Sequence, residues 1–245
     1  MQLKFLGTAD SGGIPSHNCM CSICQDYRKK GDVNLATAAY IECDNGEIIL
    51  LDAGVENIAT IFDGRNIKAV FLTHFHADHV MGLLRLRYSS HPIDCYHPKD
   101  KLGFADIYKN HRALNFQENT PFQGITHNGI TFFPVPLFHS KNTTGYIIQS
   151  NDETIAYLTD CAGMSEESLN FIKSFDLDTC YLDACLAPNF DNGNHLNYEQ
   201  ATILLDDIGA KNSHLIHSSH YTLDYIKTNH VTLKYDYILP HHLSS

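Results

Sequence analysis

Short apolar runs separated by polar turns recur along this chain, and most are three to six residues long. Their length and their β-branched and aromatic content are typical of strands, whereas longer segments with apolar positions three or four residues apart indicate helices. We predict strands at 3–6, 38–43, 47–51, 69–72, 94–97, 131–135, 145–150, 154–158, 179–182 and 214–216. We predict helices at 55–62, 79–86, 165–174, 197–207 and 223–229.

The order of these elements indicates the fold class. Strands come in pairs early in the chain and then alternate with helices, and no repeat or linker divides the sequence. Two mixed β-sheets packed face to face, with helices outside, fit this order better than a doubly wound parallel sheet. We therefore expect a single α/β domain over residues 1–245, built as an αββα sandwich.

Composition and charge narrow the classes of function. Hydrophobic residues make up 43% of the chain and charged residues 18%, and no apolar run approaches a membrane span. The N-terminal residues lack the apolar core of a signal peptide, so a cytoplasmic protein without a membrane partner is expected. A net charge of -11 without any Lys/Arg block argues against binding to nucleic acid. A small anionic substrate remains compatible, because bound cations would offset the charge locally.

The most informative stretch follows the apolar run 69–72. His74, His76, Asp78 and His79 lie within six residues there, so a turn after a strand would place all four at one edge of a sheet. Imidazole and carboxylate ligands together suit zinc, manganese or iron, and such ions activate water. A histidine-rich surface loop is the alternative interpretation.

Three later residues also follow apolar, strand-like segments: His139, Asp160 and His217. Each alone could equally be a capping or loop residue. Two adjacent ions need a bridging carboxylate and about three further ligands each, which the histidine cluster alone does not supply. The recurrence of these residues at strand ends therefore predicts that they join the cluster.

A second group of metal-binding side chains lies near the N-terminus. Cys19, Cys21 and Cys24 place three thiols within six residues, in a loop at about 15–30. Thiols so close together in a reducing compartment favour a structural zinc site, with His220 as the predicted fourth ligand. Three unlinked thiols are the alternative. The other five cysteines, at 43, 95, 161, 180 and 185, are interpreted as small buried apolar residues.

The pattern His-X-His-X-Asp-His, followed by a lone His, a lone Asp and a final His, resembles the metallo-β-lactamase superfamily. This resemblance implies that His74, His76 and His139 hold one ion, that Asp78, His79 and His217 hold a second, and that Asp160 bridges them. It also implies that Asp52 supports the site without binding metal. An aspartate at the bridging position favours phosphodiesters over β-lactams as substrates.

Further motifs are similar to the PhnP-type phosphodiesterases of the carbon–phosphorus lyase pathway. They include the Cys-X-Cys-X-X-Cys segment, the motif formed by residues 139–141 and 144–146, and the segments 194–197 and 217–220. The resemblance implies hydrolysis of 5-phospho-α-D-ribosyl 1,2-cyclic phosphate to ribose 1,5-bisphosphate in phosphonate catabolism. It places His195 near the scissile phosphate, as the group that orients it or protonates the leaving oxygen, and it implies a homodimer.

Several choices stay open at this point. The identity of the two catalytic ions is open, because manganese, zinc and nickel all fit these positions. One structural zinc is expected in addition. Arg87 and Lys141 are candidates for binding the second phosphate, or are solvated surface charges. The alternative functions are a tRNA 3′-processing ribonuclease, another small-ester or thioester hydrolase, and a non-catalytic carrier of the same fold. His241 and His242 are interpreted as a solvated pair.

Overall fold

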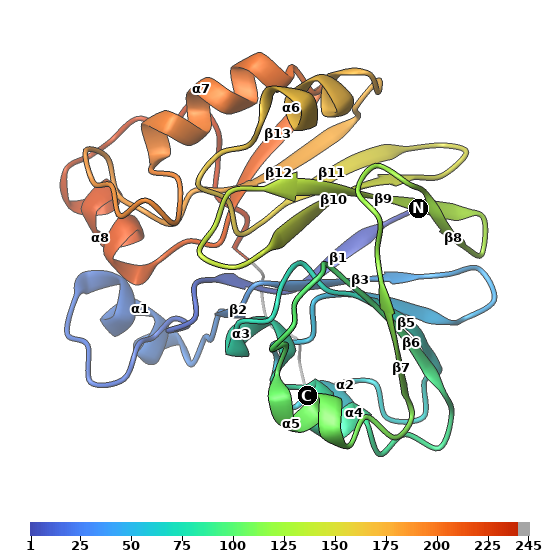
Figure 1. Cartoon of the computed structure of the whole chain (residues 1–245). Helices are drawn as coiled ribbons and strands as arrows, with labels where there is room; N and C mark the ends of the chain where they lie inside the picture. The colour runs from blue at the N-terminus through green and yellow to red at the C-terminus, as the bar shows by residue number, and fades with distance from the viewer. Residues whose placement is uncertain (240–245) are drawn as a thin grey trace.

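Two mixed β-sheets lie face to face in the computed structural model, which describes residues 1–239 (Figure 1). His241 and His242 lie outside the described residues. The predicted fold class, an αββα sandwich, is confirmed.

The first sheet has seven strands in the order β2-β1-β3-β4-β5-β6-β7. Neighbouring strands are parallel except for the pairs β1/β3 and β3/β4. The strands are β1 (Leu3–Ala9), β2 (Leu35–Ala36), β3 (Ala38–Glu42), β4 (Ile48–Leu51), β5 (Ile67–Phe71), β6 (Ile93–His97) and β7 (Leu114–Glu118).

The second sheet has six strands in the order β13-β12-β11-β10-β9-β8, and β11, β12 and β13 run parallel. Its other neighbouring pairs are antiparallel. The strands are β8 (Ile125–His127), β9 (Ile130–Leu137), β10 (Thr143–Gln149), β11 (Thr154–Leu158), β12 (Thr179–Asp183) and β13 (Asn212–Ile216).

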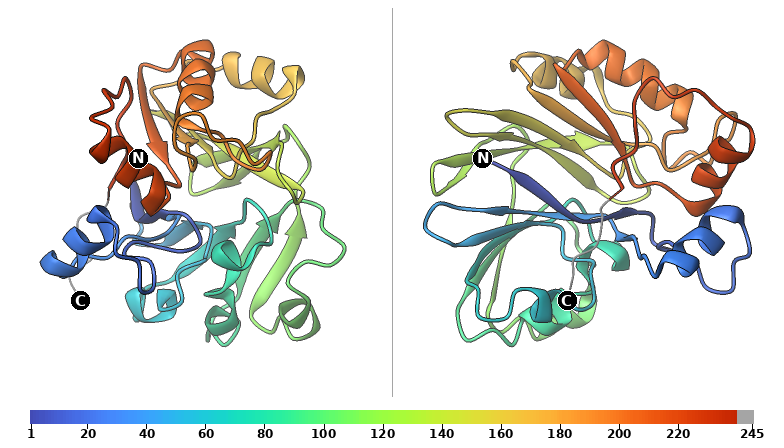
Figure 2. Two further views of the ribbon diagram at one scale, coloured as in Figure 1. Left: turned by 90° about the vertical axis from the view of Figure 1, so that its left-hand side faces the viewer. Right: turned by 180° about the vertical axis from the view of Figure 1, so that it is seen from behind.

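Helices cover the outer face of each sheet and one end of the sandwich (Figures 1 and 2). The helices α2, α4 and α5 pack on the first sheet, and α6 and α7 pack on the second; α1 and α8 lie side by side at the end. Their bounds are α1 (Ser22–Lys30), α2 (Ile58–Ile61), α3 (Ala77–Val80), α4 (Leu83–Leu86), α5 (Ala105–Lys109), α6 (Glu166–Lys173), α7 (Tyr198–Ile208) and α8 (His220–Thr228). No helix in residues 1–239 has the length and apolar character needed to cross a bilayer.

The alternation of side chains along a strand explains why the central strands are apolar throughout. In β4, Ile48 and Leu50 face the helices, whereas Ile49 and Leu51 face the second sheet, and all four are fully buried. Phe71 of β5 stacks on Phe132 of β9 across the interior, with ring centroids 3.9 Å apart. These contacts fix the two sheets against each other, so loops at the sheet ends have a rigid support.

Candidate metal centre

The polar clusters predicted at strand ends lie together at one edge of the sandwich. Asp52 follows β4 and the segment 73–79 follows the parallel strand β5, so both leave the first sheet at the same edge. Asp160 and His217 follow the parallel strands β11 and β13 of the second sheet. Asp52 and His217 turn away from their strands with φ values of 60° and 59°, a region that residues other than glycine seldom adopt.

Four predicted ligands form a first group: His74, His76, His139 and Asp160, with one donor atom from each within 4.8 Å of the others. The Nδ1 atom of His76 lies 2.7 Å from His74 Nε2 and 3.1 Å from His139 Nε2. The Oδ2 atom of Asp160 lies 3.8 Å from His74 Nε2 and 3.7 Å from His139 Nε2. Three imidazoles and one carboxylate oxygen therefore point at a common volume.

A second group shares the same aspartate: Asp78, His79, Asp160 and His217, again within 4.8 Å of one another. The other oxygen of Asp160, Oδ1, lies 3.2 Å from His217 Nε2 and 3.5 Å from His79 Nε2. The Nε2 atom of His79 is also 3.4 Å from Asp78 Oδ2. Asp160 thus presents one oxygen to each group, which is the arrangement of a bridging carboxylate.

Several buried nitrogen atoms in these groups make no hydrogen bond within the described residues. They are His79 Nε2 and both ring nitrogens of His217. A buried polar atom without a hydrogen bond is costly and rare in proteins. The lone pairs of each group converge on one volume, and zinc, manganese and nickel bind nitrogen and oxygen donors of these types. The residues of the two groups therefore fit two divalent ions.

Residues behind the ligands hold them in place. His79 Nδ1 donates a 2.8 Å hydrogen bond to Asp52 Oδ2, which leaves Nε2 free to face the second group. Asp52 Oδ1 also accepts a hydrogen bond from the backbone N–H of Thr73 (2.8 Å). Asp52 therefore supports the site from behind, as the sequence resemblance implied. His139 is fixed in the same way, because its Nδ1 donates to the carbonyl of Asn194 (2.8 Å).

Burial and mutual charge set the protonation of the cluster. Burial, together with the nearby charge of His79, holds the pKa of His74 well below its usual range. Burial alone would raise the pKa of Asp160, but His217 and His79 hold it well below its usual range. A neutral imidazole and an ionised carboxylate are the forms that bind metal, and His74 and Asp160 are in these forms. Burial opposes protonation of His79, but Asp52 and Asp160 outweigh it and raise the pKa of His79 well above its usual range, so His79 would release a proton on binding metal.

His195 lies beside the two groups without joining the first. Its ring stacks on His217 with centroids 5.0 Å apart, and its Nδ1 donates a 2.7 Å hydrogen bond to Asp183 Oδ2. Burial opposes protonation of His195, but the carboxylates of Asp183 and Asp160 outweigh it and raise its pKa to about 9. His195 lines the adjacent cavity, so its Nε2 is the ring atom left for a substrate.

Asp183 is a site residue that the sequence analysis missed. It is fully buried at the end of β12 and also accepts hydrogen bonds from the backbone N–H groups of Cys161 and Cys185, both at 2.9 Å. Three donors fix its carboxylate, which in turn fixes His195. The signal was present, because Asp183 directly follows the predicted strand 179–182, just as Asp160 follows 154–158.

The three N-terminal thiols lie beside His220. His220 Nδ1 is 3.5 Å from Cys19 Sγ and 3.6 Å from Cys21 Sγ, and Cys24 completes a group whose donor atoms lie within 4.8 Å of one another. Three sulfur atoms and one imidazole are the donor set of a closed zinc site, so these residues fit such an ion. The other five cysteines are buried, as predicted.

Helices α1 and α8 carry this second cluster. Cys21 caps the N-terminus of α1, and α8 begins at His220 after the cap Ser219. Asp224 of α8 accepts hydrogen bonds from the backbone N–H (2.8 Å) and the hydroxyl (2.7 Å) of Ser22, and Lys227 pairs with Asp26 at 2.5 Å. Because α8 starts three residues after His217, the cluster adjoins the first centre in sequence and in space.

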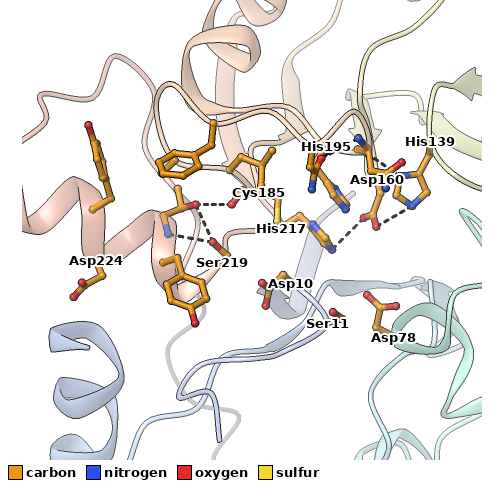
Figure 3. A pocket seen from close by; sticks show the side chains of 18 of the residues that line it. Asp10, Ser11, Asp78, His139, Asp160, Cys185, His195, His217, Ser219 and Asp224 are labelled. Atoms are coloured by element: carbon orange, nitrogen blue, oxygen red, sulfur yellow. Dashed lines mark hydrogen bonds and ion pairs between the residues drawn. The ribbon is translucent and has the colours of Figure 1, made fainter. Parts of the chain in front are cut away.

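An open cavity of about 890 Å³ adjoins the two ligand groups (Figure 3). His76, Asp78, His139, Asp160 and His217 contribute to its wall at one end. The two residues predicted for the second phosphate lie elsewhere. Lys141 pairs with Asp100 at 3.3 Å and Arg87 with Asp106 at 2.9 Å, and neither lines the cavity. The structure therefore places both in ion pairs away from the expected substrate.

Comparison with known proteins agrees with this geometry. A sequence profile of the Beta-lactamase superfamily domain matches residues 48–218, which contain all seven residues of the two ligand groups. The chain belongs to this superfamily. Membership places it among the metallo-β-lactamase hydrolases, whose fold implies binding of divalent metal, and it supports an enzyme.

The proteins that this chain resembles in sequence carry different functional names. The chain is 28% identical over 241 residues to an octanoyltransferase of Porphyromonas gingivalis. This alignment covers 90% of this chain and 46% of that protein. The chain therefore spans less than half the length of that relative. It is 26% identical over 208 residues to coenzyme PQQ synthesis protein B of Methylobacterium radiotolerans, covering 68% of this chain and 67% of that protein.

Solved structures extend the likeness to the whole fold. A crystal structure of a diphosphatase from the PhnP family superimposes with a TM-score of 0.80 at 25% identity, over 98% of this chain and 93% of that one.

Proposed function

We propose that this superfamily member is a dinuclear metal-dependent phosphodiesterase that acts on small substrates. The observation that carries the proposal is the placement of Asp160, whose two oxygens face two separate sets of ligands. In the proposed site His74, His76 and His139 hold one ion, Asp78, His79 and His217 hold the other, and Asp160 bridges them. Manganese, zinc and nickel suit these donors.

When bound, two adjacent divalent ions lower the pKa of water to near neutrality and offset charge on the phosphoryl oxygens. The side chains of the protein would bind the substrate and supply a proton to the leaving group. The cavity beside the ligands would admit the phosphodiester. A water that has lost a proton to solvent would form a new oxygen–phosphorus bond as the bond to the leaving oxygen breaks. The leaving oxygen needs a proton, which His195 is placed to donate from Nε2.

Asp183 supports that role of His195. Because His195 Nδ1 donates to Asp183, the ring is held in one orientation with Nε2 toward the cavity. The buried negative charge of Asp183 also stabilises the protonated ring, which is the form that acts as an acid. We propose Asp183 as a positioning residue that acts through His195.

The sequence resemblance points to one substrate in particular. Among small phosphodiesters, 5-phospho-α-D-ribosyl 1,2-cyclic phosphate is the first to test, and the likeness to a PhnP-family structure supports this choice. Its cyclic phosphate would lie at the ligand groups, and opening of the ring would release one ribose oxygen toward His195.

A separate structural role is proposed for the cluster at α1 and α8. Cys19, Cys21, Cys24 and His220 would hold a zinc ion that ties the loop at 15–30 to the start of α8. Since His217 lies three residues before His220, this tie would also steady one ligand of the dinuclear site.

The test is turnover of bis(p-nitrophenyl) phosphate and of the cyclic ribosyl phosphate, with manganese, zinc and nickel in turn and the bound metal counted. We expect hydrolysis with at least one metal, and reduction to background in Asp160→Asn, which loses an ionised bridge. Asp176→Asn is the matched control, because Asp176 forms an exposed ion pair with Lys211. Inactivity on both phosphodiesters with both sites loaded would contradict the proposal; cleavage of precursor tRNA or of a thioester would then identify one of the alternative hydrolases.

A further inference from the structure

The cavity continues past the ligand groups along helix α8. Asp78, Asp160 and His139 lie at one end of the row of side chains in Figure 3, and Asp224 and Ser219 lie toward the other, with His217 and Cys185 between them. Tyr221, Tyr225 and Thr228 of α8 also line this cavity. These three residues are spaced by four and three positions, so they share one face of the helix. We call this part of the cavity the distal pocket.

Aromatic rings form much of the wall of the distal pocket. Phe190 and Tyr221 line it although they are 59% and 70% exposed, and Tyr225 is half-buried. Within the described residues, Phe190 and Tyr225 make no ring contact with another aromatic side chain, and Tyr221 contacts only the ring of His220. Large ring faces are therefore left open toward the cavity.

The backbone around Phe190 is ordered by hydrogen bonds. Its N–H donates to the carbonyl of Ala187 (3.1 Å), and its own carbonyl accepts from the side chain of Asn197 (2.8 Å). Asn197 is itself the N-cap of α7, so the turn that carries Phe190 is anchored to a helix end. The ring is thus presented to the cavity by a supported turn.

The charges of the distal pocket disfavour a second anionic group. Among residues 1–239, no Lys or Arg lines the cavity, whereas Asp10 and Asp224 do. Lys227, on α8 itself, pairs with Asp26 of α1 instead. A phosphate group here would face carboxylates without a cation to offset them, which is unfavourable at short range.

We infer that the distal pocket selects phosphodiesters in which one ester group carries an uncharged planar aromatic ring, such as the base of a nucleoside, over those that carry a second phosphate. The ring would stack on Phe190, Tyr221 or Tyr225, and the tyrosine hydroxyls and Thr228 offer hydrogen bonds to its polar edge. Stacking of a base on aromatic side chains is favourable for every base, so the pocket selects a class of ligand and no single base. This inference rests on the proposed phosphodiesterase activity, and it names a nucleoside phosphodiester, in place of the cyclic ribosyl phosphate with its second phosphate, as the better substrate.

The test compares two substrates that share one scissile bond and one leaving group. They are methyl p-nitrophenyl phosphate and the p-nitrophenyl ester of thymidine 5′-phosphate. We expect kcat/KM to be at least about tenfold higher for the thymidine ester, which is within the range that stacking of one base provides. A third substrate, the same ester with an added 3′-phosphate, should be slower than the thymidine ester.

Variants of the pocket residues test whether the aromatic rings cause the preference for the thymidine ester. Phe190→Ala combined with Tyr225→Ala should bring the ratio of the two kcat/KM values toward one, while Phe190→Tyr and Tyr225→Phe, which retain the rings, should keep it. Tyr88→Ala is the matched control, because Tyr88 is as exposed as Phe190 (59%) and lies outside the cavity. It should leave the ratio unchanged.

The outcomes distinguish failure of this inference from failure of the phosphodiesterase proposal. Turnover of both p-nitrophenyl esters at a ratio near one, unaffected by loss of the rings, would overturn the inference and leave the phosphodiesterase proposal intact. Faster turnover of the ester with the added phosphate would also overturn it. If neither ester is hydrolysed, the phosphodiesterase proposal fails, and calorimetry on the metal-loaded protein decides the inference. Thymidine 5′-phosphate should then bind at least about tenfold more tightly than ribose 5-phosphate, and equal affinities would overturn it.

Discussion

At the scale of single residues, the proposed site separates into side chains that would hold metal and side chains that would face the substrate. His195 is the clearest member of the second class. Its Nδ1 donates to Asp183, and its ring stacks on that of His217 and meets that of His139 edge to face, without joining the first ligand group. Loss of such a residue should slow the reaction without emptying the site.

We therefore predict that His195→Ala lowers kcat by about 10²–10⁴-fold, the usual contribution of a general acid, while the metal content per chain stays at the wild-type value. Steady-state kinetics and elemental analysis of the same preparations measure both quantities. His91→Ala, at an exposed histidine remote from the ligand groups, is the control. Loss of metal together with activity would instead move His195 into the class of ligands.

Individual residues also mark where sequence reasoning succeeded and where it stopped. The ligands of the first centre were identifiable because each polar residue follows an apolar strand, and parallel strands end at a common edge. The role of Gly54 was not predictable, since it depends on how closely two loops approach. A Cβ at this position would lie 1.4 Å from the carbonyl oxygen of Asp78, so only glycine lets the turn after Asp52 pack against the ligand segment.

At the scale of elements, the central strands and the edge strand β13 could be predicted, whereas the peripheral strands β2, β7 and β8 could not. β4 and β11 are continuous apolar runs because both of their faces are buried. The edge strand β7 has a single fully buried residue, Leu114, and β2 has only two residues, so neither has a distinctive pattern. Their pairing with neighbours, which the sequence does not display, defines them as strands.

Two of the differences between the predicted and the observed helices have local reasons. The segment 79–86 was predicted as one helix, but the structure has α3 and α4, separated at Met81 and Gly82. Gly82 N–H donates to the carbonyl of Ala53 (2.7 Å), a tertiary contact that the periodicity does not reveal. Helix α1 was missed because Cys24 is its one buried residue, and its stability depends on contacts with α8.

The hydrogen bonds between α1 and α8 should depend on pH. The hydroxyl of Ser22 donates to Asp224, and this contact lowers the pKa of Asp224 below its usual value of 3.8. A lowered pKa in the folded state means that the contribution to stability is complete above 3.8 and is lost as the pH falls through the folded-state value.

We therefore predict that Asp224→Asn reduces the hydrogen-exchange protection of residues 22–30 near neutral pH, and that the difference from wild type shrinks as the pH falls below about 4. Comparing the two proteins at each pH cancels other acid-dependent changes that they share. Asp207→Asn removes an exposed ion pair with Lys173 on other helices and should leave α1 unaffected. A difference between Asp224→Asn and wild type that does not vary with pH would contradict the assignment.

At the scale of the whole molecule, the two clusters lie at one end of a sandwich whose interior is otherwise apolar. The first joins loops from both sheets, through His74 and His79 on one side and Asp160 and His217 on the other. The second joins α1 to α8. Bound metal should therefore connect the two sheets at this edge, and should add to the apolar contacts of Cys24 with Leu223 between α1 and α8.

Removal of metal then has two separable consequences. An ion that binds the folded state alone stabilises it, so a chelator should lower the Tm as well as abolish activity. If each cluster binds as proposed, the wild-type chain carries two ions in the first centre and one in the second. Cys21→Ser should lose only the ion of the second cluster, with faster hydrogen exchange at 15–30 and 220–228. Asp160→Asn should lose ions of the first centre and keep exchange in these two segments near the wild-type rate.

Metal counting per chain, thermal unfolding and hydrogen exchange on the three proteins measure these outcomes together. The reciprocal pattern matters more than any single loss, because a general destabilisation would reduce metal content at both clusters in either variant. Equal metal content in Cys21→Ser and wild type would show that the thiols hold no ion. The tie between α1 and α8 would then depend on the side-chain contacts of Asp224 and Lys227 and on the apolar cluster that includes Cys24 and Leu223.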